Sequence, residues 1–136
     1  MVSYLSFKWN VRVYFEDTDS GGVVYHSNYL KFMERARTEW LRSLNLNQAE
    51  LKKKDKIMFV VTKVNIDYKK AAQFNDALDI ETSVDNIGAS KVDLTQNIMK
   101  NSELYTSAKV SIACIHSETF KPQRIPKLIK QQMETL

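Results

Sequence analysis

The sequence predicts an α+β fold in which a curved antiparallel β-sheet wraps around one long central helix. Two observations carry this prediction. Apolar residues recur at helical spacing between Asn28 and Leu44, and stretches of alternating polarity come before and after them. Because only three glycines and two prolines occur in 136 residues, no linker is visible, and we expect a single domain over residues 1–136.

The first strand is predicted ahead of the helix, where apolar and polar residues alternate with period two. The residues it is expected to bury are Phe7, Trp9, Val11, Val13 and Phe15. The polar partners Lys8, Asn10 and Arg12 interrupt the apolar pattern, so the N-terminus lacks the continuous apolar core of a secretory signal.

The long helix is predicted from about Asn28 to Leu44, a length of roughly 25 Å, about enough to cross a small sheet. Its apolar half consists of Tyr29, Leu30, Phe32, Met33, Ala36, Trp40, Leu41 and Leu44. Arg37 falls inside this apolar half. We expect its guanidinium to form a structural ion pair, with Asp17 as a candidate partner, or to snorkel at an interface.

The second half of the chain is predicted to be mostly strands. A short helix is expected from Asn47, with Glu50 three residues later as a capping box. Four strands then follow over about residues 60–68, 78–84, 92–98 and 108–114, separated by turn signals. Pro126 is expected to be the first residue of a short terminal helix. The apolar residues of that helix are Leu128, Ile129, Met133 and Leu136.

The composition excludes several classes of protein. Its 43% hydrophobic and 26% charged residues are normal for a soluble globular chain, and the longest apolar run, Ile57 to Val61, is too short to cross a bilayer. One cysteine cannot form an intrachain disulfide, which suits a reducing compartment, so we expect a cytoplasmic protein. Two histidines and one cysteine leave no usual zinc set, so no metal site is expected.

The net charge of +4 and pI near 9.1 are compatible with nucleic acid, a membrane surface or a phosphorylated small molecule. No motif of stacking aromatic residues accompanies the basic residues, so nucleic acid is not an expected partner. Charge alone does not choose between the other two.

The residues between the first strand and the long helix carry the clearest functional signal. Residues 16–29 read EDTDSGGVVYHSNY, which combines carboxylates, two adjacent glycines and one histidine at the helix start. A carboxylate aimed at the free N–H groups of a helix N-terminus joins a base or nucleophile to a stabiliser of developing negative charge. This pattern predicts an acyl-transfer site.

Two further segments accompany this motif: residues 29–41 read YLKFMERARTEWL, and residues 121–126 read KPQRIP. With the motif and the order of elements, they resemble the hotdog-fold thioesterases. More narrowly, they resemble the 4-hydroxybenzoyl-CoA thioesterase family and its YbgC-like branch, which is associated with the Tol-Pal system. The resemblance covers nearly the whole chain and implies a hotdog fold and an acyl-CoA thioester hydrolase.

The resemblance also implies roles for the site residues. Asp19 is expected to attack the thioester carbonyl, giving a mixed anhydride, or to activate water as a general base. A backbone N–H near His26 is expected to hold the carbonyl oxygen, while the His26 ring polarises the carbonyl or orients water. Gly22 lets the backbone pass close to the substrate. Tyr25 is a candidate pocket wall, and Ser90 lies in a hairpin expected to approach the pantetheine.

The expected substrate is an acyl-CoA, so coenzyme A enters as part of the substrate and no other cofactor is implied. Lys91, Lys121, Arg124 and Lys127 are candidates for contacts with its phosphates. By resemblance, hotdog sites are built between protomers, which predicts a homodimer or a homotetramer. An acyl carrier protein and the inner-membrane surface are further candidate partners.

Each of these residues also has a structural interpretation, which the sequence leaves open. Asp19 can order the loop as an Asx turn, His26 can cap the helix, Tyr25 can pack, and Ser90 can be a turn residue. Glu16 and Asp17 are expected to be structural, through hydrogen bonds to loop amides or an ion pair with an arginine. Cys114 and His116 occupy alternate positions of one strand, and we interpret both as packing residues.

Two rival functions stay open at this point. One is a dehydratase of 3-hydroxyacyl thioesters, which needs a histidine and an acid poised for proton transfer. The other is a non-enzymatic adaptor that binds an acyl carrier protein or an envelope complex. Acyl chain length is also open, because Phe59 or Tyr68 can close either an aromatic or an aliphatic pocket.

Overall fold

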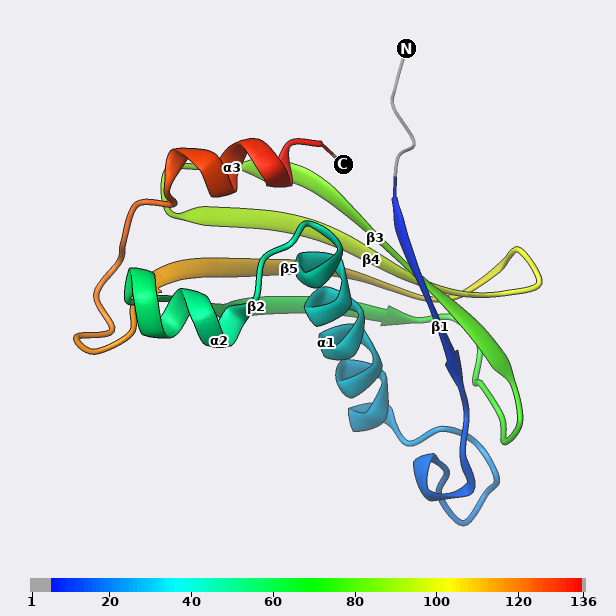
Figure 1. The fold of residues 1–136 in the computed structure, drawn as a ribbon. Helices are drawn as coiled ribbons and strands as arrows, with labels where there is room; N and C mark the ends of the chain where they lie inside the picture. Colours follow the sequence, from blue (N-terminus) through cyan, green and yellow to red (C-terminus); the bar gives the residue numbers. More distant parts are fainter. Residues whose placement is uncertain (1–5, 136) are drawn as a thin grey trace.

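The computed structural model describes residues 6–135 and confirms the predicted architecture. One long helix, α1 (His26–Ser43), packs on a five-stranded antiparallel sheet, which bends around it (Figure 1). The strands are β1 (Phe7–Arg12), β2 (Ile57–Tyr68), β3 (Ala77–Ile87), β4 (Lys91–Lys100) and β5 (Glu103–His116). Their order in the sheet is β1-β3-β4-β5-β2, so that β1 and β2 form the two edges.

The core lies between α1 and the inner face of the sheet. Tyr29, Phe32, Met33, Ala36, Trp40 and Leu41 are the buried residues of α1, as predicted. The prediction was wrong for Leu30, which is 41% exposed, and Leu44 is only half-buried. They meet alternate residues of the central strands, because side chains of a strand point to opposite faces. The buried residues of β4 and β5 are Val92, Leu94, Gln96, Ile98, Thr106, Ala108, Val110, Ile112 and Cys114. No helix among residues 6–135 is long and apolar enough to cross a membrane.

The first strand is shorter than predicted. It ends at Arg12, and a 3-10 turn over Phe15–Asp17 follows, in which the Asp17 carboxylate accepts a hydrogen bond from the N–H of Tyr14 at 2.8 Å. Val11 and Val13 are buried as expected. The expectation was wrong for Phe15, which is 77% exposed because the turn carries its side chain away from the sheet, and for Trp9, which is 36% exposed at the sheet edge.

The two short helices agree with the prediction in part. The Asn47 side chain caps helix α2 (Gln48–Glu50) by accepting hydrogen bonds from the N–H groups of Ala49 and Glu50, and a π-helical turn over Leu51–Asp55 follows. Pro126 is the N-cap of α3 (Lys127–Met133) rather than its first residue. Helix α3 buries Ile129 and Met133, but Leu128 is 74% exposed, contrary to expectation, and Leu136 lies outside the described residues.

Within the part of the chain that the structure describes, Arg37 does not form the ion pair predicted for it. Its guanidinium donates to the side-chain oxygen of Gln96 at 2.8 Å, and the Gln96 amide nitrogen in turn donates to the carbonyl of Met33 at 3.0 Å and to the hydroxyl of Thr82 at 2.9 Å. Gln96 and Thr82 are fully buried. The partner of Arg37 is therefore a neutral amide, and the middle of α1 is tied to the sheet by a buried polar network. Burial lowers the pKa of the Arg37 guanidinium, which still stays charged.

Candidate active site

The loop between β1 and α1 folds back on itself around Asp19. Thr18 and Val24 pair as an isolated antiparallel bridge, and the N–H of Asp19 donates to the carbonyl of Val23 at 2.9 Å. The turn closes when the N–H of Gly22 donates to the carbonyl of Asp19 at 3.0 Å. Gly22 has a φ of 81°, a conformation that side chains with a Cβ rarely adopt, which explains a glycine at this position.

Asp19 takes part in an Asx turn and still presents a carboxylate oxygen. Its Oδ1 accepts a hydrogen bond from the N–H of Gly21 at 2.8 Å, as the structural interpretation expected. Within residues 6–135, no donor binds Oδ2, and the residue is exposed. The turn therefore fixes the direction of the carboxylate without using both of its oxygens.

Two backbone carbonyls anchor the loop to the rest of the molecule. The carbonyl of Asp17 accepts hydrogen bonds from the N–H of Tyr25 at 3.1 Å and from the side-chain amide of Asn28 at 2.8 Å. The backbone of Ala72 is held on both sides, since its carbonyl accepts from Val24 and its N–H donates to the hydroxyl of Tyr29. The Asp19 turn is thus fixed to the first turns of α1 by hydrogen bonds, not by side-chain packing alone.

The N-terminus of α1 points free N–H groups out of the helix. Tyr25 is the N-cap, and its side chain makes no capping hydrogen bond, so His26 does not act as the cap. The first N–H groups of a helix have no intrahelical acceptor. Among the described residues, the N–H groups of His26 and Ser27 also meet no acceptor elsewhere. These donors, together with the helix dipole, favour negative charge at this end of α1.

A cavity of about 270 Å³ brings the carboxylate and the helix end together. Its lining residues are Asp19, Val23, Val24, Tyr25, His26, Tyr29, Tyr68, Lys69, Lys70 and Ala71. Three predicted site residues, Asp19, Tyr25 and His26, therefore share one cavity. Gly22 belongs to the same turn but does not line it. Within residues 6–135, no group of three His, Cys, Asp or Glu side chains is placed to hold a metal ion.

The far wall of the cavity comes from the end of β2 and the segment after it. The rings of His26 and Tyr68 are stacked, with centroids 4.4 Å apart and planes 18° from parallel. Lys69 and Lys70 bring positive charge to the rim, although each also pairs with an acid, Asp67 and Glu103 respectively. From the sequence, Tyr68 is expected only as a strand residue able to close a pocket. Its contact with His26 joins positions 42 residues apart and leaves no local signal in the sequence.

Neither Ser90 nor any of the basic candidates Lys91, Lys121, Arg124 and Lys127 lines the Asp19 cavity. Ser90 sits in the turn between β3 and β4, beside α3, at the end of the sheet opposite the Asp19 loop (Figure 1). Its carbonyl accepts from the N–H of Cys114 at 2.8 Å. A second cavity, of about 350 Å³, adjoins this turn and is lined by Ala89, Arg124, Ile125, Lys127 and Lys130. The structure does not bring Ser90 to the Asp19 cavity of its own chain.

Cys114 and His116 are placed as packing residues. Cys114 is fully buried, and this burial raises the pKa of its thiol to about 11, which keeps it protonated and unreactive near neutral pH. The Nδ1 atom of His116 accepts hydrogen bonds from the N–H groups of Glu118 and Thr119, so it orders the turn after β5.

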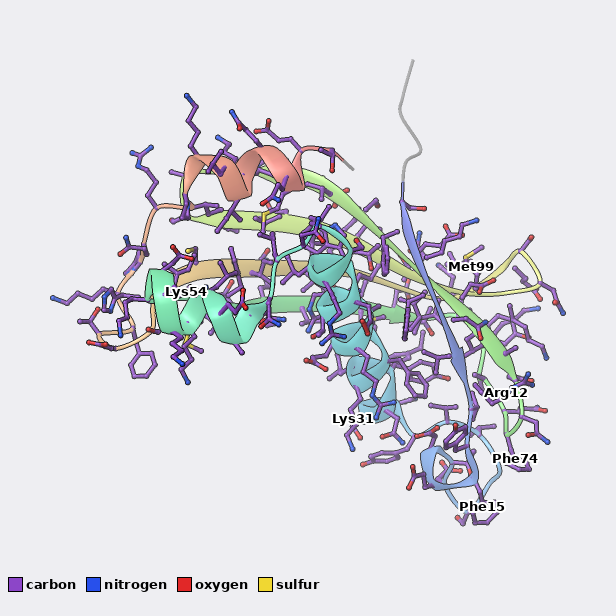
Figure 2. All side chains as sticks on the ribbon, in the orientation of Figure 1. Arg12, Phe15, Lys31, Lys54, Phe74 and Met99 are labelled. Carbon is purple, nitrogen blue, oxygen red and sulfur yellow. The ribbon has the colours of Figure 1, made fainter. Side chains whose placement is uncertain are left out.

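Aromatic side chains mark the outer end of the Asp19 loop. Phe15 and Phe74 lie next to each other at the tip of the molecule (Figure 2), with ring centroids 6.0 Å apart in an edge-to-face arrangement. Arg12 reaches the same region and donates to the carbonyl of Asn75 at 2.6 Å. The segment after β2 is therefore attached to the loop both at the tip and at Ala72.

The helix on a five-stranded antiparallel sheet is the hotdog fold, and solved hotdog thioesterases superpose on it. A 1,4-dihydroxy-2-naphthoyl-CoA thioesterase from Synechocystis has a TM-score of 0.88 over 96% of this chain and 97% of that chain, at 22% identity, a likeness of fold alone. A probable thioesterase from Bartonella henselae is 36% identical, with a TM-score of 0.85 over 90% of this chain and 100% of that chain.

Sequence comparison then gives the family. The model of the thioesterase-like superfamily matches residues 13–133, and the chain belongs to this superfamily. Among its curated relatives, the acyl-CoA thioesterase YbgC of Haemophilus influenzae is 44% identical over 124 residues, which cover 91% of each chain. The acyl-CoA thioester hydrolase YbgC of Escherichia coli O6:H1 is 40% identical over 124 residues, 90% of this chain and 92% of that one. The resemblance to the YbgC-like branch is confirmed.

Proposed function

We propose that this protein hydrolyses acyl-CoA thioesters to a free acid and coenzyme A, with Asp19 as the reacting carboxylate and the first turn of α1 as the oxyanion stabiliser. The observation that carries the proposal is the shared cavity, in which Asp19 and His26 line one space of about 270 Å³. The names of the YbgC relatives support the same substrate class.

The proposed chemistry follows from where charge develops. As a nucleophile adds to the thioester carbonyl, its oxygen becomes negative, and the free N–H groups of His26 and Ser27 stabilise that charge. Loss of one such donor costs about 3–4 kcal/mol in related sites. The carbon–sulfur bond then breaks, and the coenzyme A thiolate leaves with little need for a proton.

Two routes for Asp19 remain within this proposal. Its carboxylate attacks the carbonyl, and water later cleaves the mixed anhydride, or it removes a proton from a water molecule that attacks directly. In both routes the exposed ring of His26 is placed to polarise the carbonyl or to orient the water. A single turnover in ¹⁸O-labelled water tests for the anhydride, because label in Asp19 arises only when water attacks the Asp19 carbonyl carbon of that intermediate.

Recognition of coenzyme A is proposed to involve a second copy of the chain. Strand β2 is an edge strand with Val61 and Val64 exposed, and an unpaired edge favours association. A homodimer or homotetramer brings the Ser90 turn of one copy within reach of the other copy's cavity. Arg124 and Lys127, which line the second cavity beside that turn, are then candidates for the phosphates.

The test is thiol release from short, long and aromatic acyl-CoA substrates, with the matching acyl-pantetheines in parallel. Asp19→Asn is expected to lower kcat by at least about a thousandfold, since an amide neither attacks nor takes a proton. Glu16→Gln is the control, because it removes an exposed carboxylate from the same loop without touching the cavity. A higher KM for the pantetheines would support contacts to the nucleotide.

The outcomes distinguish the proposal from its rivals. Full activity in a folded Asp19→Asn variant contradicts the mechanism. No turnover of any substrate, combined with tight binding of an acyl carrier protein, favours the adaptor. An enoyl product in place of free thiol favours the dehydratase.

A further inference from the structure

Tyr68 makes two contacts with the first residue of α1. Its ring stacks on the ring of His26, with centroids 4.4 Å apart and an angle of 18° between the planes. Its hydroxyl donates to the backbone carbonyl of His26 at 3.4 Å. The same residue therefore touches both the side chain and the first peptide of the helix end at which we place the oxyanion.

Tyr68 is itself held in place on two sides. The ring of Tyr29 meets it edge to face, with centroids 5.3 Å apart, and Tyr29 is buried with its hydroxyl bound to the N–H of Ala72. The Tyr68 backbone pairs with Thr106 at the end of β2, and the next two N–H groups both donate to the carbonyl of Tyr105. Although Tyr68 is 37% exposed, its ring contacts both the buried Tyr29 and His26.

His26 depends on this stacking for its orientation. Within residues 6–135, the imidazole nitrogens make no hydrogen bond, and the side chain is exposed toward the cavity. An imidazole without a hydrogen-bonding partner rotates about its side-chain bonds unless a neighbour limits it. The face of Tyr68 is the surface that limits it here.

We propose that Tyr68 is a positioning residue, which holds the His26 ring through stacking and the first peptide of α1 through its hydroxyl. This inference rests on the proposed thioesterase function. Misplacement of a reacting group by about 1 Å costs roughly a hundredfold in rate, so a residue that only positions another still affects kcat.

Two variants separate the ring from the hydroxyl. Tyr68→Phe keeps the stacking and removes the hydrogen bond, and it is expected to lower kcat about threefold. Tyr68→Leu removes both, and it is expected to lower kcat by roughly thirtyfold, with KM changed by less than about twofold. Tyr105→Leu is the matched control, since it removes a half-buried tyrosine of the neighbouring strand that does not line the cavity.

A second measurement does not depend on activity. The chain has two histidines, so the ring Hε1 protons give one assignable NMR signal for each, and His116 serves as the internal reference. The stacked Tyr68 ring shields His26. The His26 signal is therefore expected to stay shifted in Tyr68→Phe and to move toward its free position in Tyr68→Leu, while the His116 signal stays unchanged.

The paired readouts make each outcome decisive. A fall in kcat together with a moved His26 signal supports the proposal. If the signal moves but kcat does not change, stacking has no part in the reaction, and if kcat falls while the signal stays fixed, Tyr68 acts by another route; both overturn it. Because the NMR signal is measured without substrate, failure of the thioesterase function itself appears separately, as absence of turnover in the parent chain, and failure of the Asp19 mechanism appears as activity that survives in Asp19→Asn.

Discussion

The first turn of α1 and the middle of the same helix are held in opposite ways. At the middle, Arg37, Gln96 and Thr82 form a network of side chains in which Gln96 and Thr82 are fully buried. At the first turn, the anchors are hydrogen bonds to the backbone groups of Asp17 and Ala72, and the side chains of Asp19 and His26 are exposed.

This difference separates what stabilises the fold from what is available for chemistry. A buried network loses free energy when one member is removed, because the remaining polar groups cannot reach water. A carboxylate held by a backbone turn can be replaced with little structural cost, since the turn stays closed without it. Changes in the middle of α1 should therefore lower stability, and changes at its first turn should lower activity.

The largest effect on stability is expected from Gln96→Leu. It removes the acceptor of the Arg37 guanidinium and the donor to Met33 and Thr82. A half-buried charge and a buried hydroxyl left without their partners are costly, and we expect a loss of about 2–3 kcal/mol in the free energy of unfolding. Urea denaturation followed by circular dichroism measures it, and kcat of the folded fraction should change little.

The double variant Arg37→Met with Gln96→Leu sharpens this prediction. Replacing both partners with apolar side chains removes the unpaired charge, so the double variant should recover part of the loss seen in Gln96→Leu alone. Arg37→Met alone is measured as well. If the stability losses of the two single variants simply add in the double variant, Arg37 and Gln96 are not coupled, and the network does not hold the helix.

The sequence brought together the residues of the candidate site, which line one cavity, more successfully than those of the buried network at the middle of α1. Asp19 and His26 are seven positions apart on one loop and one helix start, so their motif is local and readable. Arg37 is anomalous within the apolar half of α1, and the sequence pattern suggests a carboxylate as its partner. Gln96 lies 59 positions away and follows the same alternation as its apolar neighbours, so only the strand register places it beneath the helix.

The same dependence on contacts between distant elements explains why the sequence pattern did not predict the positions of Phe15 and Tyr68. Phe15 continues the alternation of the first strand, yet the hydrogen bond from Tyr14 to Asp17 ends that strand and turns Phe15 outward. Tyr68 ends a well-predicted strand, but its position against His26 depends on where β2 lies relative to α1. Local periodicity predicts elements, whereas contacts between distant elements depend on packing that the pattern does not encode.

A smaller effect is expected from Gly22→Ala, which strains the turn at Asp19. The φ of 81° costs a residue with a Cβ about 1 kcal/mol, although no atom lies within 4 Å of the added carbon. Relaxation of the turn should also shift the Asp19 carbonyl that Gly22 binds and lower kcat several-fold. Gly88→Ala is the matched control for stability, because its Cβ meets only ordinary contact with Lys91 at 3.5 Å. Equal unfolding free energies in the two variants would contradict the assigned strain.

The smallest effect is expected on the core when residues around the Asp19 cavity are changed. The rate at which the buried Cys114 thiol is alkylated reports on the core. Cys114 is fully buried and its pKa is raised to about 11, so alkylation near pH 8 requires opening of the sheet to expose and ionise the thiol. Asp19→Asn and Tyr68→Phe should leave the labelling rate within about twofold of the parent chain, whereas Gln96→Leu should raise it in proportion to the population of open molecules. Since the folded pKa lies above the ordinary value of 9.0, ionisation favours the unfolded chain between about pH 9 and 11, and stability should fall as pH rises through this range. Faster labelling in Asp19→Asn would mean that the Asp19 turn also supports the core, and the division between the two parts of α1 would not hold.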